Sequence, residues 1–232
     1  MARLTLALRR DNVYSMRSYT IPALIGLATI LGAQQAAAPN PRDVVLAGDR
    51  FKPLKYDQMT PAQKTMIENL LAGERRGTGG PFNVLLRSPE IGDLAQKLGA
   101  GVRFHSSLPP KLNELGIIVT ARYWTAQFEW NAHKRAALAA GLDPAIVDAI
   151  AAGKRPVKMQ PDEDAIYTFG TELLRTKQVS DATFQTAVKA VGERGVVDLI
   201  SVMGYYQLVS MLLNVDRYPL GAGVQPELKP LP

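Results

Sequence analysis

Signals for helix starts and stops recur along this chain, and they restrict what it can fold into. At residues 60–63 (TPAQ) an N-cap threonine, a proline at the first helical position and a capping-box glutamine follow one another. Similar starts precede apolar-periodic runs at residues 88–89, 109–110 and 143–144. No useful length of sequence alternates apolar and polar residues with period two. We therefore predict an all-α fold.

The helices predicted from this punctuation fall within one helical domain over residues 59–216. We expect them at about residues 60–72, 88–99, 111–140, 143–152, 162–176, 181–191 and 196–214. Residues 39–58 have no clear period and are predicted to form an extended arm. The glycine-rich segment 74–81 is predicted to be a flexible loop, and the proline-rich residues 217–232 an irregular tail.

The N-terminal segment has the pattern of a secretory signal. No charged residue lies between Arg17 and Arg42, and residues 20–33 form an apolar run of signal-peptide length. Three alanines follow it at a suitable place for cleavage. We predict that residues 1–38 are a signal peptide, that the protein is exported to the periplasm and that no membrane span remains after cleavage. Met16 is a second candidate start, and an uncleaved N-terminal anchor is the alternative.

Composition excludes several classes of function. The formal charge is +6, but the chain has no basic stripe with interleaved aromatic residues, so we expect no nucleic-acid partner. It has no cysteine, which excludes disulfides, thiolate catalysis and CxxC redox chemistry. His105 and His133 are the only histidines, too few for a His-rich metal site. We predict His105 to be a capping or surface residue.

One pair of residues is suited to proton transfer. Glu129 and His133 lie four residues apart in a predicted helix, so they share a face. A carboxylate beside an imidazole fixes its tautomer and raises its pKa, and the histidine can then act as acid or base near neutral pH. The apolar sequence around the pair favours a buried site. The alternative is a surface salt bridge of little energetic weight.

Glu114 belongs to the same apolar run and makes a geometric demand. It precedes His133 by 19 residues, which is about 28 Å along an unbroken helix. The two side chains can meet only if the helix breaks and the chain turns back. Thr125 is a plausible N-cap for the second half, which would place Glu129 in a first turn, where the helix dipole favours a carboxylate.

A weak internal repeat relates the two halves of the domain. A shift of 82 residues places the Leu-Ile-Tyr-Trp pattern at positions 115, 118, 123 and 124 on Val197, Ile200, Tyr205 and Tyr206. We predict two pseudo-repeats, at about residues 89–152 and 162–214. The second is degenerate, because valine or methionine stands where the first has Glu114, Glu129 and His133. Chance similarity between two buried helices is the alternative.

The layout of the first copy resembles a known family. A glutamate, then positions 12, 15 and 19 residues later, and a glycine eight residues beyond the last, are typical of the carboxymuconolactone decarboxylase and alkylhydroperoxidase D-like superfamily. In this chain those positions are Glu114, Ala126, Glu129, His133 and Gly141. Glutamate and histidine at the third and fourth positions match the decarboxylase branch.

The peroxidase branch of the superfamily differs at the positions that carry its chemistry. It has the two cysteines of a CxxC motif where this chain has Ala126 and Glu129, and a further histidine where this chain has Phe128. A peroxiredoxin activity assigned at family level therefore does not carry over to this sequence, because the thiols are missing.

The resemblance implies an alkylhydroperoxidase D-like helical bundle that assembles as a homotrimer or homohexamer and uses no metal or organic cofactor. It also implies a lyase acting on a small carboxylic acid or lactone. His133 would be the general acid or base, and Glu129 and Glu114 would orient it or shuttle protons. We further predict a substrate-binding role for Arg122, whose guanidinium suits a carboxylate, and for Trp124 and Trp130, which have core or interface packing as the alternative role.

Family decarboxylases are shorter, cytoplasmic and single-copy, whereas this chain is predicted to be exported and duplicated. The specific substrate therefore stays open, and a non-catalytic periplasmic binding or assembly protein on the same fold is the rival function.

Overall fold

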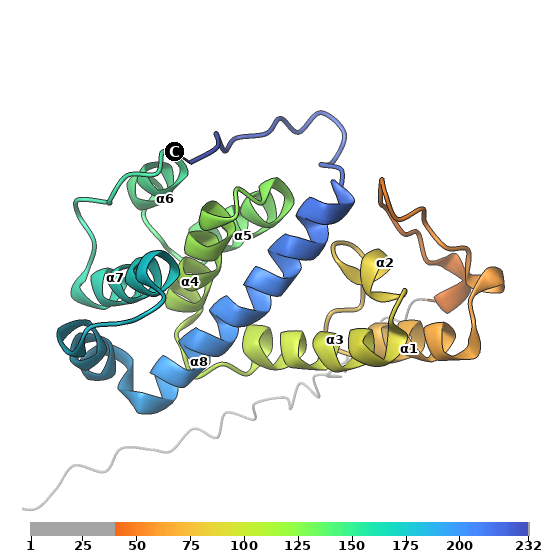
Figure 1. The fold of residues 1–232 in the computed structure, drawn as a ribbon, viewed down its shortest axis with the longest axis horizontal. Helices are drawn as coiled ribbons and strands as arrows, with labels where there is room; N and C mark the ends of the chain where they lie inside the picture. Colours follow the sequence, from red (N-terminus) through yellow and green to blue (C-terminus); the bar gives the residue numbers. More distant parts are fainter. Residues whose placement is uncertain (1–39, 232) are drawn as a thin grey trace, which may run out of the picture. The chain divides into compact units, whose positions relative to one another are not determined.

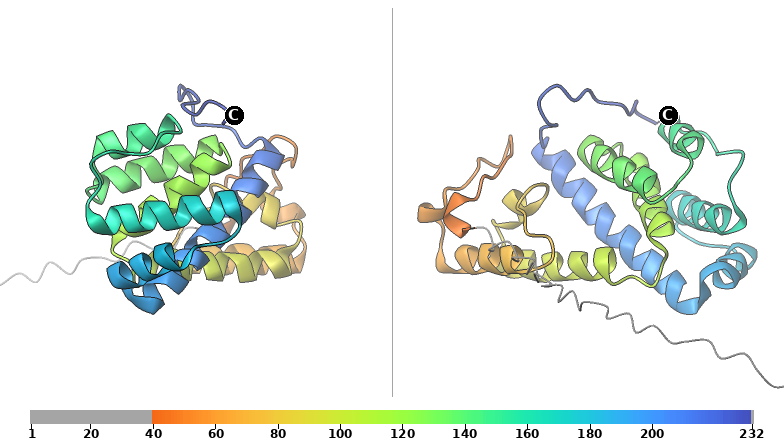
Figure 2. Two further views of the ribbon diagram at one scale, coloured as in Figure 1. Left: turned by 60° about the vertical axis from the view of Figure 1, so that its left-hand side comes forward. Right: turned by 180° about the vertical axis from the view of Figure 1, so that it is seen from behind.

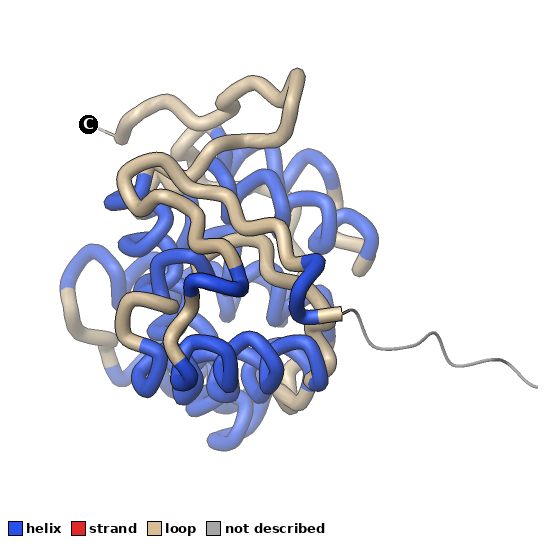
Figure 3. The backbone as a smooth tube through the Cα atoms, turned by 90° about the vertical axis from the view of Figure 1, so that its right-hand side faces the viewer, coloured by secondary structure: helices blue, strands red, loops and turns tan. Residues whose placement is uncertain are grey.

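The computed structural model describes residues 40–231, so the predicted signal peptide lies outside the described residues. Within this range the secondary structure is helical and contains no strand (Figures 1 and 3), which confirms the all-α prediction. The helices are α1 (Pro61–Ala72), α2 (Phe82–Leu85), α3 (Pro89–Phe104), α4 (Pro110–Tyr123), α5 (Gln127–Ala139), α6 (Pro144–Ala151), α7 (Pro161–Thr176) and α8 (Asp181–Asp216). Two short 3-10 turns, Pro41–Asp43 and Tyr56–Gln58, lie in the preceding arm.

The start of α1 forms as its sequence predicts. The Thr60 side chain accepts a hydrogen bond from the Gln63 backbone N–H, and the Gln63 side chain accepts one from the Thr60 N–H. This reciprocal capping box satisfies two donors that a helix start leaves without partners. Gly73 follows the helix as its C-cap residue.

Helix α3 continues past the predicted end at Gly99 and reaches Phe104. Gly99 does not stop the helix. It allows another side chain to approach closely, because a Cβ built at this position would lie 2.2 Å from Cζ of Tyr205. The glycine is therefore explained by tertiary packing rather than by a helix stop.

Helix α8 is interrupted at one residue. Gly192 has φ +71° and ψ 169°, outside the helical region, and it divides α8 where we predicted two helices. The second part is long and apolar enough to cross a membrane, but half of its apolar window is buried inside the structure, as in the core helix of a globular domain.

Helix α8 lies between two groups of helices (Figures 1 and 2). On one side it contacts α2 and α3, which in turn contact each other, and α1 packs on α3. On the other side it contacts α4, α5 and α7, with α6 packed on α4 and α5. The main core lies in this second group and contains buried Leu115, Ile118, Trp130, Ile166 and Leu199. A smaller cluster joins α3, α4 and α8 through Val102, Ile117, Val202, Tyr205 and Tyr206.

The two segments predicted to be pseudo-repeats differ at the position of the chain reversal. The first copy is interrupted between α4 and α5, at residues 124–126. The positions 82 residues later, 206–208, lie inside the continuous second part of α8. The second copy therefore lacks both the ionisable residues and the turn.

Candidate active site

The chain reverses between α4 and α5, as a shared site for Glu114 and His133 requires. Thr125 has a left-handed backbone (φ +49°), and its hydroxyl accepts a hydrogen bond from Arg122 Nη1 at 3.3 Å. Ala126 is the N-cap of α5 and makes no side-chain cap. The prediction that Thr125 caps α5 is therefore wrong: Thr125 is the left-handed residue after Trp124, the C-cap of α4, and Ala126 has the extended backbone of the N-cap. Glu129 lies in the first turn of α5 as expected.

The reversal brings the three predicted residues together in a buried network. His133 Nδ1 lies 2.7 Å from Glu114 Oε2, and His133 Nε2 lies 3.2 Å from Glu129 Oε2. The exposed fractions of the side chains are 12% for Glu114 and 6% for the other two. Glu129 Oε2 has no hydrogen-bond partner among the described residues, so its contact with His133 is an ion pair without hydrogen-bond geometry. A solvent-exposed salt bridge does not describe this arrangement.

The network changes the acidity of His133. Burial lowers the pKa of this imidazole, but the contacts with Glu114 and Glu129 and the negative charge of both carboxylates outweigh that effect and raise the pKa to about 9. At neutral pH the ring is therefore a protonated imidazolium. Its protonated form can donate a proton, which makes the group a general acid in its resting state.

A cavity of about 260 Å³ opens at His133 and Glu129. Residues from five parts of the chain line it: the loop before α2, α2 itself, and helices α3, α5 and α8. Its walls carry two arginines and four aromatic rings, namely Arg75, Arg103, Phe82, Phe128, Tyr205 and Tyr206. Glu114 does not line the cavity and contacts His133 through the opposite ring nitrogen. The arrangement suits a small, partly aromatic or conjugated anion.

The comparison with protein-family models agrees with this site. Residues 89–167 match the model described as carboxymuconolactone decarboxylase family. This segment is similar to that family. The match runs from the start of α3 into α7 and includes Glu114, Glu129 and His133, so the resemblance predicted from their spacing is confirmed. A search of curated proteins gave no match.

Three residues predicted to bind substrate do not line the His133 cavity. Trp130 is fully buried in the main core, and its Nε1 donates to Glu227 Oε2 at 3.3 Å. It directly follows Glu129, so it points about 100° away around α5. Trp124 lines a separate groove beside the end of α8. Arg122 lies eight residues after Glu114, about 80° further around α4, and it faces α6 and α7. The structure therefore does not bring these three residues to the cavity beside His133.

The His133 cavity is also lined by residues that sequence reasoning did not predict as site residues. Arg75 comes from the loop predicted to be only flexible, and its guanidinium lies 5.6 Å from the ring centre of Phe82 and 5.8 Å from that of Tyr205. Its Nη2 donates to the Tyr205 hydroxyl at 3.4 Å, and its buried Nε has no partner among the described residues. Tyr206 packs edge-to-face against His133, with 4.7 Å between the centres of the two rings. The 82-residue shift marked Tyr205 and Tyr206 as part of a repeated pattern, but it did not indicate that they lie beside His133, and no spacing pattern pointed to Arg75.

No three His, Asp or Glu side chains in the part of the chain from residue 40 to 231 are placed to hold a metal ion. His105 is a surface residue, as predicted: its Nε2 lies 2.6 Å from Glu74 Oε1, and its side chain is 66% exposed.

The contact at Gly99 predicts how the cavity wall responds to a methyl group. Gly99→Ala places a Cβ 2.2 Å from Tyr205 Cζ and 2.5 Å from Arg75 Nη2. We expect it to destabilise the protein by about 1–3 kcal/mol through overpacking, and to reduce activity because both side chains line the cavity. Gly101→Ala is the matched control on the same helix. It meets nothing within 4 Å and should stabilise by about 0.5–1 kcal/mol through helix propensity. Urea denaturation of both variants checks this, and equal effects would contradict it.

Proposed function

We propose that this chain is a carboxy-lyase that removes CO₂ from a small carboxylic acid or lactone, with His133 as the proton donor and without an organic cofactor. The observation that carries the proposal is the buried Glu114–His133–Glu129 network at the wall of a cavity with two arginines. The match of residues 89–167 to the decarboxylase family model supports decarboxylase-like chemistry at family level. A non-catalytic binding protein has less need of a protonated histidine held between two buried carboxylates.

The proposed reaction begins with loss of the carboxylate. The C–C bond to the carboxylate breaks, its electron pair passes into the conjugated system of the substrate, and CO₂ leaves. Negative charge then accumulates on an electron-accepting oxygen such as a lactone carbonyl. A guanidinium paired with the departing carboxylate would slow the reaction, because it would stabilise a negative charge that disappears when CO₂ leaves. We therefore assign Arg75 to the accepting oxygen or to an acidic group that is retained, where it stabilises the developing charge.

The proton required to complete the reaction comes from the network. His133 loses a proton from Nε2, either directly to the substrate carbon or through Glu129, which shares the cavity wall. A carboxylate and one proton thus give a C–H bond and CO₂, and the neutral imidazole takes up a proton from water. Glu114 stays on Nδ1, where it holds the ring in place and stabilises the imidazolium before each turnover.

A substrate panel tests the proposal. The protein is incubated with small lactone carboxylic acids and with acids from aromatic catabolism, CO₂ release is measured, and crystals are soaked with the same compounds. We expect CO₂ release from at least one lactone acid, with ligand density beside His133 and Arg75. Ligand density at this cavity without turnover of any compound would favour the binding-protein alternative and contradict the lyase.

We also propose export through residues 1–38, on the strength of the apolar run and the alanines that follow it. N-terminal sequencing of the protein from a periplasmic fraction tests this. An intact N-terminus in the cytoplasm would contradict it.

A homo-oligomer is proposed from two exposed apolar faces. On α3, Ile91, Leu94 and Leu98 are between 52% and 65% exposed and lie three and four residues apart. On α8 the corresponding face contains Val197, Ile200, Met211 and Val215, which are 41–60% exposed. Because α3 packs against α8, both faces are available for one interface with a second copy of the chain. A trimer or hexamer is expected.

Disrupting the α3 face should dissociate this assembly. Leu94→Glu introduces a charge at the most exposed apolar position of the face, and its burial in an interface is costly. We expect light scattering to show a smaller particle for this variant. Arg135→Glu, at an exposed position of α5, is the control and should keep the native mass. A wild-type protein that is monomeric at micromolar concentration would contradict the proposal.

A further inference from the structure

A second cavity, of about 70 Å³, lies on the other side of α4 and has no described lining residue in common with the His133 cavity. It is bounded by α4, α6 and α7, and Leu231 of the C-terminal tail lies at its edge. Its described lining residues are Val119, Arg122, Tyr123, Ile150, Gly153, Lys154, Tyr167, Thr171, Leu174, Arg175 and Leu231. The lining combines apolar side chains with three cations and, among these residues, no acid.

Arg122 is a buried cation in this lining without a carboxylate partner among the described residues. It is 6% exposed, and its Nε has no hydrogen-bond partner within residues 40–231. Among the described residues, its side chain makes one hydrogen bond, from Nη1 to Thr125, and no ion pair. Burial lowers the pKa of this guanidinium, and no carboxylate offsets the effect. A buried charge without a partner is unfavourable, and a bound anion would relieve it.

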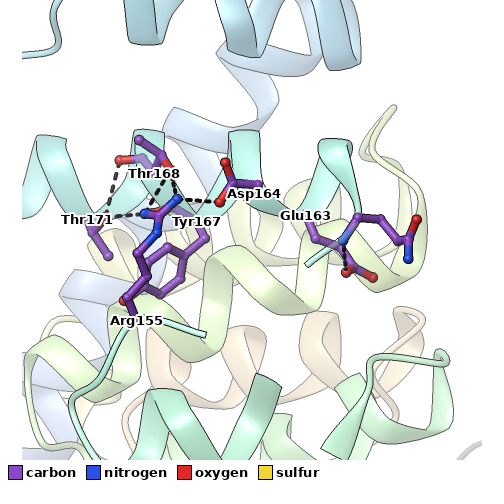
Figure 4. Close-up of polar contacts among 7 residues, drawn as sticks. Arg155, Glu163, Asp164, Tyr167, Thr168 and Thr171 are labelled. Carbon is purple, nitrogen blue, oxygen red and sulfur yellow. Dashed lines mark hydrogen bonds and ion pairs between the residues drawn. The ribbon is translucent and has the colours of Figure 1, made fainter. Parts of the chain in front are cut away.

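The surrounding wall is held in place by another arginine whose charge is already matched. Arg155, in the connection between α6 and α7, donates to Asp164 and Thr168 on α7 (Figure 4). Its guanidinium lies 5.4 Å from the ring centre of Tyr167, which lines the cavity. These contacts fasten the connection to α7, and with it the neighbouring Lys154. Arg155 thus has a carboxylate partner in Asp164, whereas Arg122 has none among the described residues.

Glycine at position 153 keeps the space beside Arg122 open. Gly153 has φ +69°, and a Cβ built there would lie 2.8 Å from a Leu231 methyl group and 3.6 Å from Arg122 Nη2. The end of the guanidinium therefore reaches the cavity wall formed by Gly153. A side chain at this position would fill the approach to it.

We propose that this second cavity binds a short-chain monocarboxylate, with its carboxylate on Arg122 and its apolar part against Val119, Ile150 and Leu174. Arginine presents parallel N–H donors that match a carboxylate. The cavity volume corresponds to roughly five water-sized positions, which suits an acid of about four carbons. Lys154 and Arg175 add positive charge at the rim. This site is independent of the proposed lyase activity, because the two cavities are lined by different residues.

Calorimetric titration of the full protein with butyrate tests the proposal. Wild-type protein should bind butyrate and should not bind butyramide, which has the same shape without the charge. Arg122→Met should weaken butyrate binding at least about tenfold, because a charge-assisted pair is lost. Arg135→Met, an exposed arginine elsewhere, and Arg75→Met, in the His133 cavity, should leave this binding unchanged.

A folding defect in Arg122→Met would not end the test. Arg175 has no hydrogen bond or ion pair with another described side chain, so Arg175→Met should fold, and we expect it to weaken butyrate binding severalfold. Several results would overturn the proposal. They are no butyrate binding at millimolar concentration, loss of binding in Arg75→Met alone, phosphate binding as tightly as butyrate, or butyrate binding that appears only after residues 230–232 are removed. The last result would mean that the end of this chain is the occupant.

Discussion

Replacement of His133 by glutamine should lower the rate of CO₂ release by at least about 100-fold, because general acid catalysis by a positioned side chain contributes about 10²–10⁴-fold. Glutamine keeps a polar group between Glu114 and Glu129 but cannot donate a proton as an acid. The loss should appear in kcat more than in KM, since His133 donates its proton only after CO₂ has left, and the negative charge of the substrate is assigned to Arg75.

His105→Gln is the matched control for this experiment. It removes the other histidine, which also contacts a glutamate but lies at the surface, and it should keep wild-type activity. Because removal of a buried partner leaves two carboxylates close together, circular dichroism must first show that His133→Gln is folded. If it is not, Glu129→Gln is the second variant. It keeps the imidazole and its contact with Glu114 and should still lose activity. A folded His133→Gln protein with full activity would refute the mechanism.

The sequence predicts well those features that depend on local spacing. The capping box at Thr60 follows directly from residue types three positions apart. Glu114 and His133 are 19 residues apart, so they can share a site only if the helix between them breaks and the chain turns back. The structure has this break. The break at Thr125 was expected at the right place, although with the wrong capping role, because spacing does not determine which residue takes a positive φ.

Features that depend on contacts between distant segments were not predictable in this way. Arg75 lines the cavity beside Tyr205, which comes 130 residues later in the chain and packs over Gly99 of α3. Arg122 was predicted to bind a carboxylate beside His133, but it lines the second cavity, because its direction depends on how α4 packs against α6 and α7. Spacing identified Glu114, Glu129 and His133, whereas the packing of helices and loops determines which cavity each arginine faces.

The raised pKa of His133 also predicts how stability depends on pH. An unfolded histidine has its ordinary pKa of 6.5, and the folded value is about 9. The folded state therefore binds the proton more tightly, and the resulting stabilisation is fully present below about pH 6.5 and is lost as the pH rises through 9. A shift of this size corresponds to about 3 kcal/mol. Wild-type protein should thus lose this contribution between pH 5 and pH 10.

Urea denaturation of wild type, His133→Gln and His105→Gln at a fixed protein concentration measures the effect. Other groups that titrate at high pH are common to all three proteins, so the informative quantity is the difference in unfolding free energy between wild type and His133→Gln. This difference should fall by about 3 kcal/mol from pH 5 to pH 10, whereas the difference between wild type and His105→Gln should be small, because that side chain is 66% exposed and its ion pair with Glu74 is screened by solvent. A difference that rises with pH would mean that the folded protein holds His133 neutral. In that case the ring would be a resting base, and the protonated donor required for the proposed decarboxylation would have to be another group in the cavity.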